Sequence, residues 1–322
     1  MRRLPWFVGT SLLALAGGLA VGSVPLTPGE VWNGLLHRTA DSATIVRQLR
    51  LPRVLLAYAV GGSLAASGAA LQALVRNPMA DPYLLGLAGG AGLGAVAIIA
   101  LGAQGPWFLP SGAFVGALLA VGLVYRLSVA AGRRLDPRVL LLAGVVVGAF
   151  TASIMTTIIS LSDAAQLRNA YVWLLGGLGG ASWLSLGVFA AYAALPLWLL
   201  ALLARRLDLL ALGEESALHL GTDVERTKRL VVLATALLTA AAVAFCGTIG
   251  FVGLVVPHAV RLIRGPLYRS LLPLSFLAGG TFLVVADTIA RSVVSPLELP
   301  VGAVTALVGV PLFAVLLRRS LT

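Results

Sequence analysis

The most polar stretch of the chain spans residues 205–229 and reads RRLDLLALGEESALHLGTDVERTKR. Ten of its 25 residues are Asp, Glu, Lys or Arg, whereas the whole chain is only 11% charged. Long apolar runs lie on both sides of it. Charged residues between apolar runs are typical of a loop that emerges from a membrane. This segment is therefore predicted to form the largest polar surface on one side of a membrane protein.

A short helix is predicted inside this stretch, from Glu214 to Leu220. Gly213 would break the chain before the helix and Gly221 would stop it. Two interpretations remain open, a loop packed on its own bundle and a docking surface for a cytoplasmic partner. We favour docking, because a solvated linker would not need the leucines that accompany the charges. The residues predicted to dock are Leu212, Gly213, Glu214, Glu215, Leu218 and Gly221.

Composition places the chain among polytopic membrane proteins. It has 322 residues, of which 59% are hydrophobic, and a mean hydropathy of +0.99. The 37 glycines suit helices that approach each other closely in lipid. The net charge of +11 sits between hydrophobic runs, so it indicates membrane orientation rather than nucleic-acid binding. Cys246 is the only cysteine, which excludes an intrachain disulfide and a cysteine-based metal site.

Ten membrane-spanning helices are predicted in a single domain over residues 1–322, because a span needs roughly 20 apolar residues. The first begins like a signal peptide but is expected to be a retained helix. A glycine-rich segment, residues 247–258, should break the helical pattern before the eighth span. A short helix is expected at 28–36, behind a capping box at Thr27 and Glu30, and an interfacial helix at 163–175. The ten spans are about 4–24, 52–74, 83–101, 110–128, 139–159, 183–203, 230–246, a short one ending near Arg264, 271–290 and 301–317.

Basic residues orient this topology. With a cytoplasmic N-terminus, 17 of the 23 Lys and Arg residues fall on the inner side and six on the outer side. That bias follows the positive-inside rule and places segment 205–229 and both termini in the cytoplasm. The six outer residues are Arg38, Arg47, Arg50, Arg53, Arg168 and Arg291.

Small and hydroxyl residues recur every four positions in the fifth span. They form one stripe along the predicted helix, which either packs against a neighbouring helix or lines a path for a bulky solute. The candidate path residues are Gly144, Gly148, Thr156 and Ser160.

Catalytic and metal-binding motifs are scarce in the sequence. The only lysine, Lys228, follows Arg226-Thr227, so the chain has no P-loop. The three histidines lie in different segments without the spacing of metal ligands. Asp287 is the one acid well inside a span, about one turn from Arg291. It is either a functional carboxylate or a structural pair with that arginine. So little intramembrane charge disfavours an ion-coupled secondary transporter. An intramembrane enzyme is disfavoured because the sequence shows no clustered acids or histidines and no nucleophile–base set.

Seven motifs, in this order, resemble the permease subunits of type II ATP-binding-cassette (ABC) importers for ferric siderophores, haem and cobalamin. The resemblance covers nearly the whole chain. The motifs are RLPR (50–53), GAALQALVRNPMADP (68–82), LLG (84–86), LLAG (141–144), LGEESALHLG (212–221), GFVGLVVPHAVR (250–261) and ELPVG (298–302).

This resemblance implies the all-helical, ten-span fold of these permeases, in the inner (cytoplasmic) membrane. It implies a homodimer with the solute path between the copies, two ATPase subunits below and a solute-binding protein outside. The chain itself would bind no cofactor, and ATP and magnesium would be used by the ATPases. The cargo stays open among siderophore, haem and cobalamin.

The resemblance also assigns roles to residues. Segment 212–221 would seat in the ATPases. Arg50, Arg53 and Arg291 match the outer arginines that receive acidic residues of the binding protein; the alternative is that they anchor the chain at the interface. The cytoplasmic gate would include Asn77, Met79, Pro137 and Arg138, although relatives can have small hydroxyl residues at the last two positions.

Overall fold

A computed structural model describes the protein over residues 4–37, 42–130, 135–294 and 296–321. Over these ranges the chain forms thirteen α-helices, one π-helix (η1) and one 3-10 helix (η2). The elements are α1 (Leu4–Ala20), α2 (Pro28–Leu36), η1 (Ile45–Arg50), α3 (Leu51–Val75), η2 (Pro82–Leu85), α4 (Leu87–Ala100), α5 (Phe108–Ala130), α6 (Pro137–Ser160), α7 (Ala164–Leu174), α8 (Trp183–Ala211), α9 (Glu214–His219), α10 (Val224–Cys246), α11 (Val252–Arg264), α12 (Tyr268–Ala290) and α13 (Val301–Leu321).

The ten predicted spans correspond in order to α1, α3, α4, α5, α6, α8, α10, α11, α12 and α13. Six of them, α3 with η1, α5, α6, α8, α10 and α12, are long and apolar enough to cross a membrane. Helices α1, α4 and α13 are apolar but shorter, and α11 has 13 residues. The predicted all-α polytopic fold is confirmed.

Several predicted boundaries were wrong. The second span begins at Ile45, because η1 runs into α3 without a break. The third span is interrupted, since Gly86 adopts a left-handed conformation (φ +77°) between η2 and α4. The sixth span continues to Ala211 and the seventh begins at Val224, because both helices keep a buried face in this polar stretch. The buried residues are Leu207 and Leu210 in α8 and Val224, Thr227 and Lys228 in α10.

The predicted short elements are present. Helix α2 begins with the capping box between Thr27 and Glu30. Hydrogen bonds from the backbone N–H and hydroxyl of Thr27 lower the pKa of the Glu30 carboxyl. Helix α7 covers the second interfacial segment, and the expected break separates α10 from α11. In that break Phe251 has φ +68°, which is unusual for a residue other than glycine.

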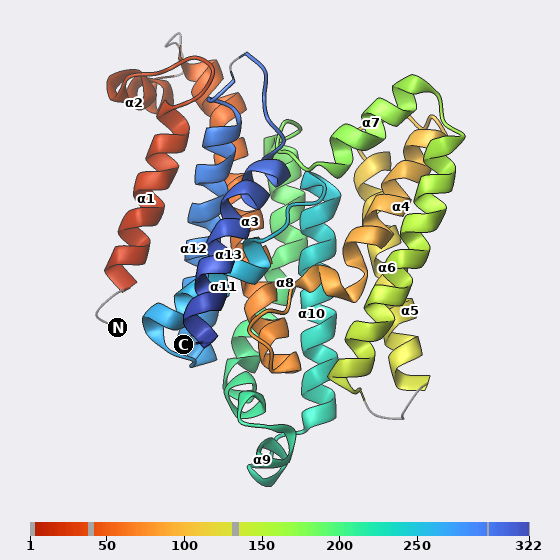
Figure 1. The fold of residues 1–322 in the computed structure, drawn as a ribbon. Coiled ribbons are helices and arrows are strands. Elements are labelled where there is room, and N and C mark those ends of the chain that lie inside the picture. Colours follow the sequence, from red (N-terminus) through yellow and green to blue (C-terminus); the bar gives the residue numbers. More distant parts are fainter. Residues whose placement is uncertain (1–3, 38–41, 131–134, 295, 322) are drawn as a thin grey trace.

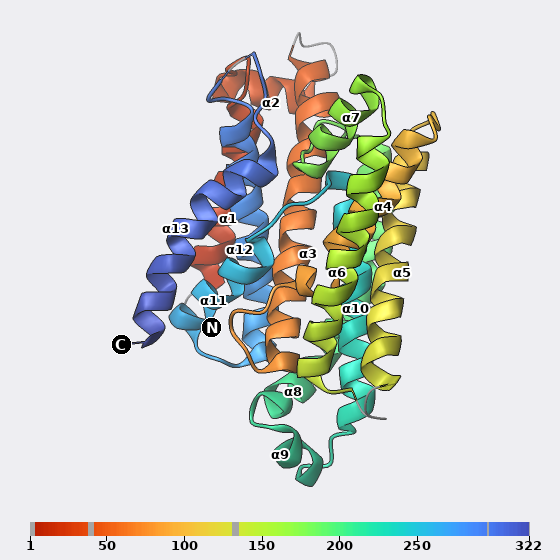
Figure 2. The same ribbon diagram turned by 45° about the vertical axis from the view of Figure 1, so that its right-hand side comes forward.

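Helices α3 and α10 form the centre of the bundle. In the most apolar 18-residue stretch of each of these two helices, more than two-thirds of the residues are buried. In the corresponding stretches of α5, α6 and α8, less than a third of the residues are buried. In Figures 1 and 2, α1, α12 and α13 lie on one side of this centre and α4, α5 and α6 on the other. The exposed apolar faces of α5, α6 and α8 are thus available to lipid or to another chain.

Glycines bring α3 close to α11 and α12. Gly61 of α3 lies against the backbone of Gly279 in α12, and Gly68 lies against Gly253 in α11. A Cβ at Gly61 or Gly68 would overlap the carbonyl group opposite. Such contacts let the backbones approach closely, which is how helices associate in lipid.

Helix α9 projects from one end of the bundle, whereas α2 and α7 lie at the opposite end (Figure 1). Helix α1 begins and α13 ends in the half nearer α9 (Figure 1). The charge count also used residues that lie outside the described ranges, namely Arg2, Arg3, Arg38, Arg133 and Arg134.

Candidate functional site

Helix α9 is a short projecting helix held between two left-handed glycines. Gly213 precedes it with φ +124° and Gly221 follows it with φ +78°, conformations that L side chains rarely adopt. Ala217 is buried against the bundle, but the leucines on the outside are not. Leu212 is 69% exposed and Leu218 is 55% exposed. We call the exposed residues Leu212, Glu215, Leu218 and Leu220 the α9 face.

Lys228, the only lysine of the chain, holds α9 in place from beneath. Its side chain is 3% exposed, and its ammonium lies 2.7 Å from Glu214 Oε2 and 3.2 Å from Glu225 Oε1. A buried ammonium needs such partners, because leaving it unpaired is costly. Glu214 is thus half turned into the protein, and Glu215 is the acid that α9 presents to solvent.

The same ammonium joins α9 to the chain that precedes α6. Lys228 Nζ donates to the carbonyl oxygen of Leu135 at 2.7 Å. In return the Leu135 N–H donates to Glu225 Oε2 at 3.2 Å. We call Leu135, Glu214, Glu225 and Lys228 the link cluster. It connects the projecting helix to the start of α6 through a chain of charged hydrogen bonds.

A cleft of about 580 Å³ opens beside the link cluster. The C-terminal end of α3 forms one wall, and the turn before α6 forms another. Asp136 caps α6 by accepting from the Arg138 N–H at 2.7 Å, and Pro137 occupies the first turn of the helix. Proline suits that position, because its missing N–H would be unpaired there anyway.

The cleft brings together only part of the predicted gate. Pro137 and Arg138 line it, together with Arg76 at the end of α3. Asn77 and Met79 are not among its lining residues. They form a local turn, in which Asn77 Oδ1 accepts from the Met79 N–H at 2.9 Å. The gate function of these four residues stays a prediction.

The small-residue stripe of α6 divides into two parts. Gly144 is buried against the backbone of Leu84, and a Cβ would overlap that carbonyl, so Gly144 is a packing position rather than a path residue. Thr156 and Ser160 are exposed on the single chain, and their hydroxyls donate to carbonyls of their own helix. Gly148 has no atom near its missing side chain. These last three residues are available to line a path between two copies.

At the opposite end of the bundle, Asp287 of α12 is the centre of a charge cluster. Its side chain is 1% exposed and lies 2.9 Å from Arg53 and 3.4 Å from Arg291. Arg53 also pairs with Glu298 at 2.9 Å, and Glu298 is 47% exposed. We call Arg50, Arg53, Asp287, Arg291 and Glu298 the outer cluster. The structural pair of Asp287 and Arg291, one of the two interpretations of the sequence, is present.

Two arginines of the outer cluster hold the end of α1. Arg50 donates to the carbonyls of Leu19 at 2.7 Å and of Ala20 at 2.8 Å, and Arg291 donates to the carbonyl of Gly18. Cations at a helix C-terminus satisfy its last carbonyls and its dipole. Both arginines are buried, so Arg53 and Glu298 are the more accessible members. Docking of a binding protein at Arg50, Arg53 and Arg291 stays a prediction.

Residues 10–319 match the model of the FecCD transport family. The chain belongs to the FecCD transport family. Its resemblance to the permeases of type II ABC importers is therefore confirmed. FecCD proteins of this kind are permease subunits and not enzymes, and ATP is hydrolysed in separate ATPase subunits.

Other permeases align with this chain over most of its length. The cobalamin import system permease protein BtuC of Halobacterium salinarum is 46% identical over 85% of this chain and 73% of its own length. The vitamin B12 import system permease protein BtuC of Klebsiella pneumoniae is 41% identical over 98% of this chain and 94% of its own length. A solved metal-chelate type ABC transporter in an inward-facing conformation is 30% identical, with a TM-score of 0.89 over 99% of both chains.

Three residues of this FecCD permease were not assigned from the sequence. In the sequence Lys228 served only to exclude a P-loop, and Glu298 appeared only within the ELPVG motif (298–302). Gln72, deep in α3, accepts from Arg261 at 3.0 Å and donates to the Leu254 carbonyl at 3.2 Å. Gln72, a lone amide in an apolar run, is the one of the three that the sequence signals, because a polar group in lipid must have a partner. Lys228 lies in the polar segment 205–229 and Glu298 lies between two predicted spans, so neither of them stands out in the sequence.

Metal binding by side chains of this chain has no support among the described residues. Within them, no group of three or more His, Cys, Asp and Glu could hold a metal ion. Cys246 is buried in α10.

Proposed function

We propose that the chain is the permease of an ABC importer that carries a cobalamin-type metal chelate into the cytoplasm. The observation that carries this proposal is the identity of 41% to 46% with two proteins named as cobalamin or vitamin B12 permeases. Siderophore and haem are the competing cargoes, because they belong to the same class of bulky chelates.

Uptake by reconstituted vesicles tests the cargo. The permease is placed in proteoliposomes with its ATPase and its solute-binding protein, and labelled cyanocobalamin, a ferric siderophore and haem are offered in turn. We expect cyanocobalamin to accumulate only with ATP and magnesium on the ATPase side. Preferred uptake of the siderophore or haem would reject the cargo. Uptake driven by an ion gradient without ATP would instead favour a secondary transporter.

The proposed assembly contains two copies of the chain, two ATPases and one solute-binding protein. The exposed apolar face of α6 supports pairing of two copies, and Gly148, Thr156 and Ser160 on that helix would face the path between them. The α9 face, with leucines in contact with solvent, supports docking of an ATPase. No cofactor is proposed for the chain itself, since ATP and magnesium serve the ATPase.

The link cluster is proposed to carry ATPase movement to the gate. A displacement of α9 would pull on Lys228 through Glu214, and Lys228 in turn holds Leu135. Asp136, Pro137 and Arg138 follow at once in the sequence. Lys228 is thus a positioning residue, which acts on the solute path through the turn before α6 and not by touching the solute.

On the outer side, the binding protein is proposed to dock above the outer cluster. Its acidic residues would compete with Glu298 for Arg53, which is the accessible arginine of the predicted three. Arg50 and Arg291 would support the site by holding α1 and Asp287 in place. Binding kinetics of Glu298→Gln test this, because loss of a competing carboxylate should speed docking at low salt. Unchanged kinetics would reject docking at this cluster.

A further inference from the structure

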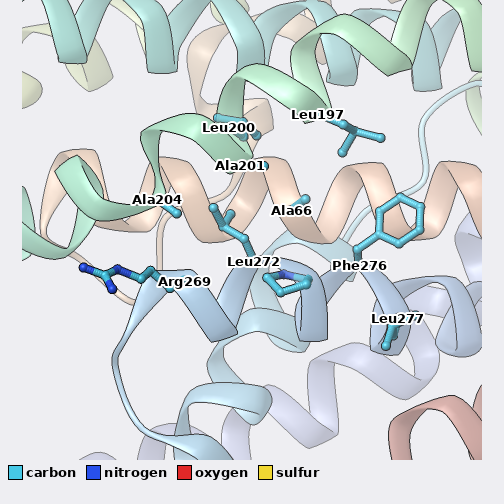
Figure 3. A pocket seen from close by; sticks show the side chains of 10 residues that line it. Ala66, Leu197, Leu200, Ala201, Ala204, Arg269, Leu272, Phe276 and Leu277 are labelled. Atoms are coloured by element: carbon cyan, nitrogen blue, oxygen red, sulfur yellow. The ribbon is translucent and has the colours of Figure 1, made fainter. Parts of the chain in front are cut away.

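An apolar groove runs along the surface between α3, α8 and α12, outside the coupling and outer sites. Its volume is about 430 Å³, within the range of small-molecule sites. Ala66 of α3 lies at its floor, and Leu200 of α8 and Leu272 and Phe276 of α12 line its sides (Figure 3). Small side chains create the space: Ala201 of α8 is exposed beside it.

One end of this groove carries charge. Arg269, in the first turn of α12, lines it, and its side chain is 61% exposed (Figure 3). Its only ion pair in the described residues is a long one, 3.7 Å from Arg269 Nε to Asp208 Oδ2. Asp208 is already engaged, because its other oxygen accepts from the Tyr268 N–H at 2.5 Å. Arg205 lies one helical turn beyond Ala201 on α8 and is also exposed.

We propose that this groove binds one acyl chain of an anionic phospholipid, whose phosphate contacts Arg269 and Arg205. The shape fits: the groove is apolar along its length and basic at one end. Its place fits too, since α8 and α12 are long and apolar enough to cross a membrane. Arg269 pairs with Asp208 in the last turn of α8, which leads to the end of the bundle from which α9 projects (Figure 1). Basic pockets between spans on the cytoplasmic side recognise anionic headgroups.

The charge at this end explains why the lipid is anionic. Arg269 pairs with a single carboxylate, Asp208, whose other oxygen is engaged by the backbone of α12, and Arg205 is exposed one helical turn beyond Ala201. A phosphate with a further negative charge can pair with both guanidinium groups, whereas a zwitterionic headgroup brings its own cation to the same place. The preference for anionic lipid therefore does not depend on which way the chain is oriented.

Native mass spectrometry of the intact importer complex tests the proposal. The complex is titrated with phosphatidylglycerol and, separately, with phosphatidylcholine of the same acyl chains. We expect one phosphatidylglycerol per permease chain, bound about tenfold more tightly than phosphatidylcholine. Ala201→Phe should fill the groove and reduce binding of both lipids. Arg269→Gln should remove the preference for phosphatidylglycerol. Leu202→Phe and Arg206→Gln, exposed neighbours on α8 beside Ala201 and Arg205, are the matched controls and should bind as the parent does.

Each other outcome would overturn the proposal. Unchanged lipid binding in Ala201→Phe would place the lipid elsewhere. Loss in Ala201→Phe with an unchanged preference in Arg269→Gln would leave an apolar groove that does not recognise a headgroup. Displacement of the lipid by inorganic phosphate alone would indicate an ion site. Dissociation of the permease pair in Ala201→Phe would make the groove a contact between copies.

Discussion

Lys228 is the residue on which the coupling end of the bundle depends most. It satisfies two carboxylates and a carbonyl from three different segments while its own side chain is 3% exposed. A positive charge so placed contributes to stability only while its partners stay within reach. Any movement of α9 must therefore either carry Leu135 with it or break a buried ion pair.

Lys228→Met should uncouple ATP hydrolysis from transport. The substitution keeps an apolar stem of similar length but removes the three contacts, which costs about 1–3 kcal/mol of stability. We expect ATPase activity to persist while cargo uptake falls by tenfold or more, measured in the same proteoliposomes. Arg229→Gln, an exposed neighbour, is the control and should keep both rates. Parallel loss of hydrolysis and uptake would indicate a folding defect and refute the positioning role.

At the scale of single residues, the sequence predicted ion pairs only between residues that are close along the chain. Asp287 and Arg291 are one turn apart, so their pairing could be expected. Arg53 meets the same carboxylate from 234 positions away, and Lys228 meets Leu135 from 93 positions away. Those contacts depend on how helices pack, which hydropathy and spacing do not specify.

At the scale of elements, α9 is a helix too short to be stable alone, held by two glycines and one ion pair. Its existence was predictable from Gly213, Gly221 and the leucines between them. The C-terminal end of α8 and the N-terminal end of α10 were not predictable, because the charges in these segments suggested a loop. Their apolar faces stay buried up to Leu210 and from Val224, so packing extended both helices.

Leu218→Asp on the α9 face should weaken ATPase binding. The side chain is 55% exposed in the single chain and would be buried in the proposed complex. An unpaired carboxylate at such an interface costs at least about 1.4 kcal/mol, or tenfold in affinity. Co-purification of the ATPase measures the effect. Arg168→Glu on α7, at the opposite end, is the control. Equal ATPase recovery from both variants would favour a loop that packs only on its own bundle.

Gly68→Ala should destabilise the contact between α3 and α11. Its Cβ would overlap the carbonyl of Gly253, so one backbone must shift, at a cost of roughly 1–3 kcal/mol or more. Gly187→Ala in α8 meets nothing within 4 Å and should be neutral or slightly stabilising. Thermal unfolding in detergent compares the two variants. If Gly68→Ala were as stable as Gly187→Ala, this would contradict the close packing of α3 against α11.

At the scale of the whole molecule, the polar groups gather at two ends of an apolar bundle. The link cluster and α9 lie at one end, and the outer cluster lies near α2 and α7 at the other (Figure 1). This separation was predicted from the apolar spans together with the distribution of Lys and Arg between them. The sequence could not predict that Arg50 and Arg291 would be buried, because burial is a property of the assembled bundle.

Orientation in the membrane is the prediction that the rest of the mechanism requires. We expect cysteines at Leu220 and Leu267 to react with a membrane-impermeant maleimide only from the cytoplasmic side, and one at Arg168 only from outside. All three side chains are exposed, and the native Cys246 is buried, so it gives little background. Thr222→Cys is the buried control at the same end and should react slowly from either side. Addition of the ATPase should protect Leu220→Cys, which lies on the α9 face, but leave Leu267→Cys reactive. Labelling of Leu267→Cys from outside would invert the topology, and the α9 face could then no longer meet a cytoplasmic ATPase.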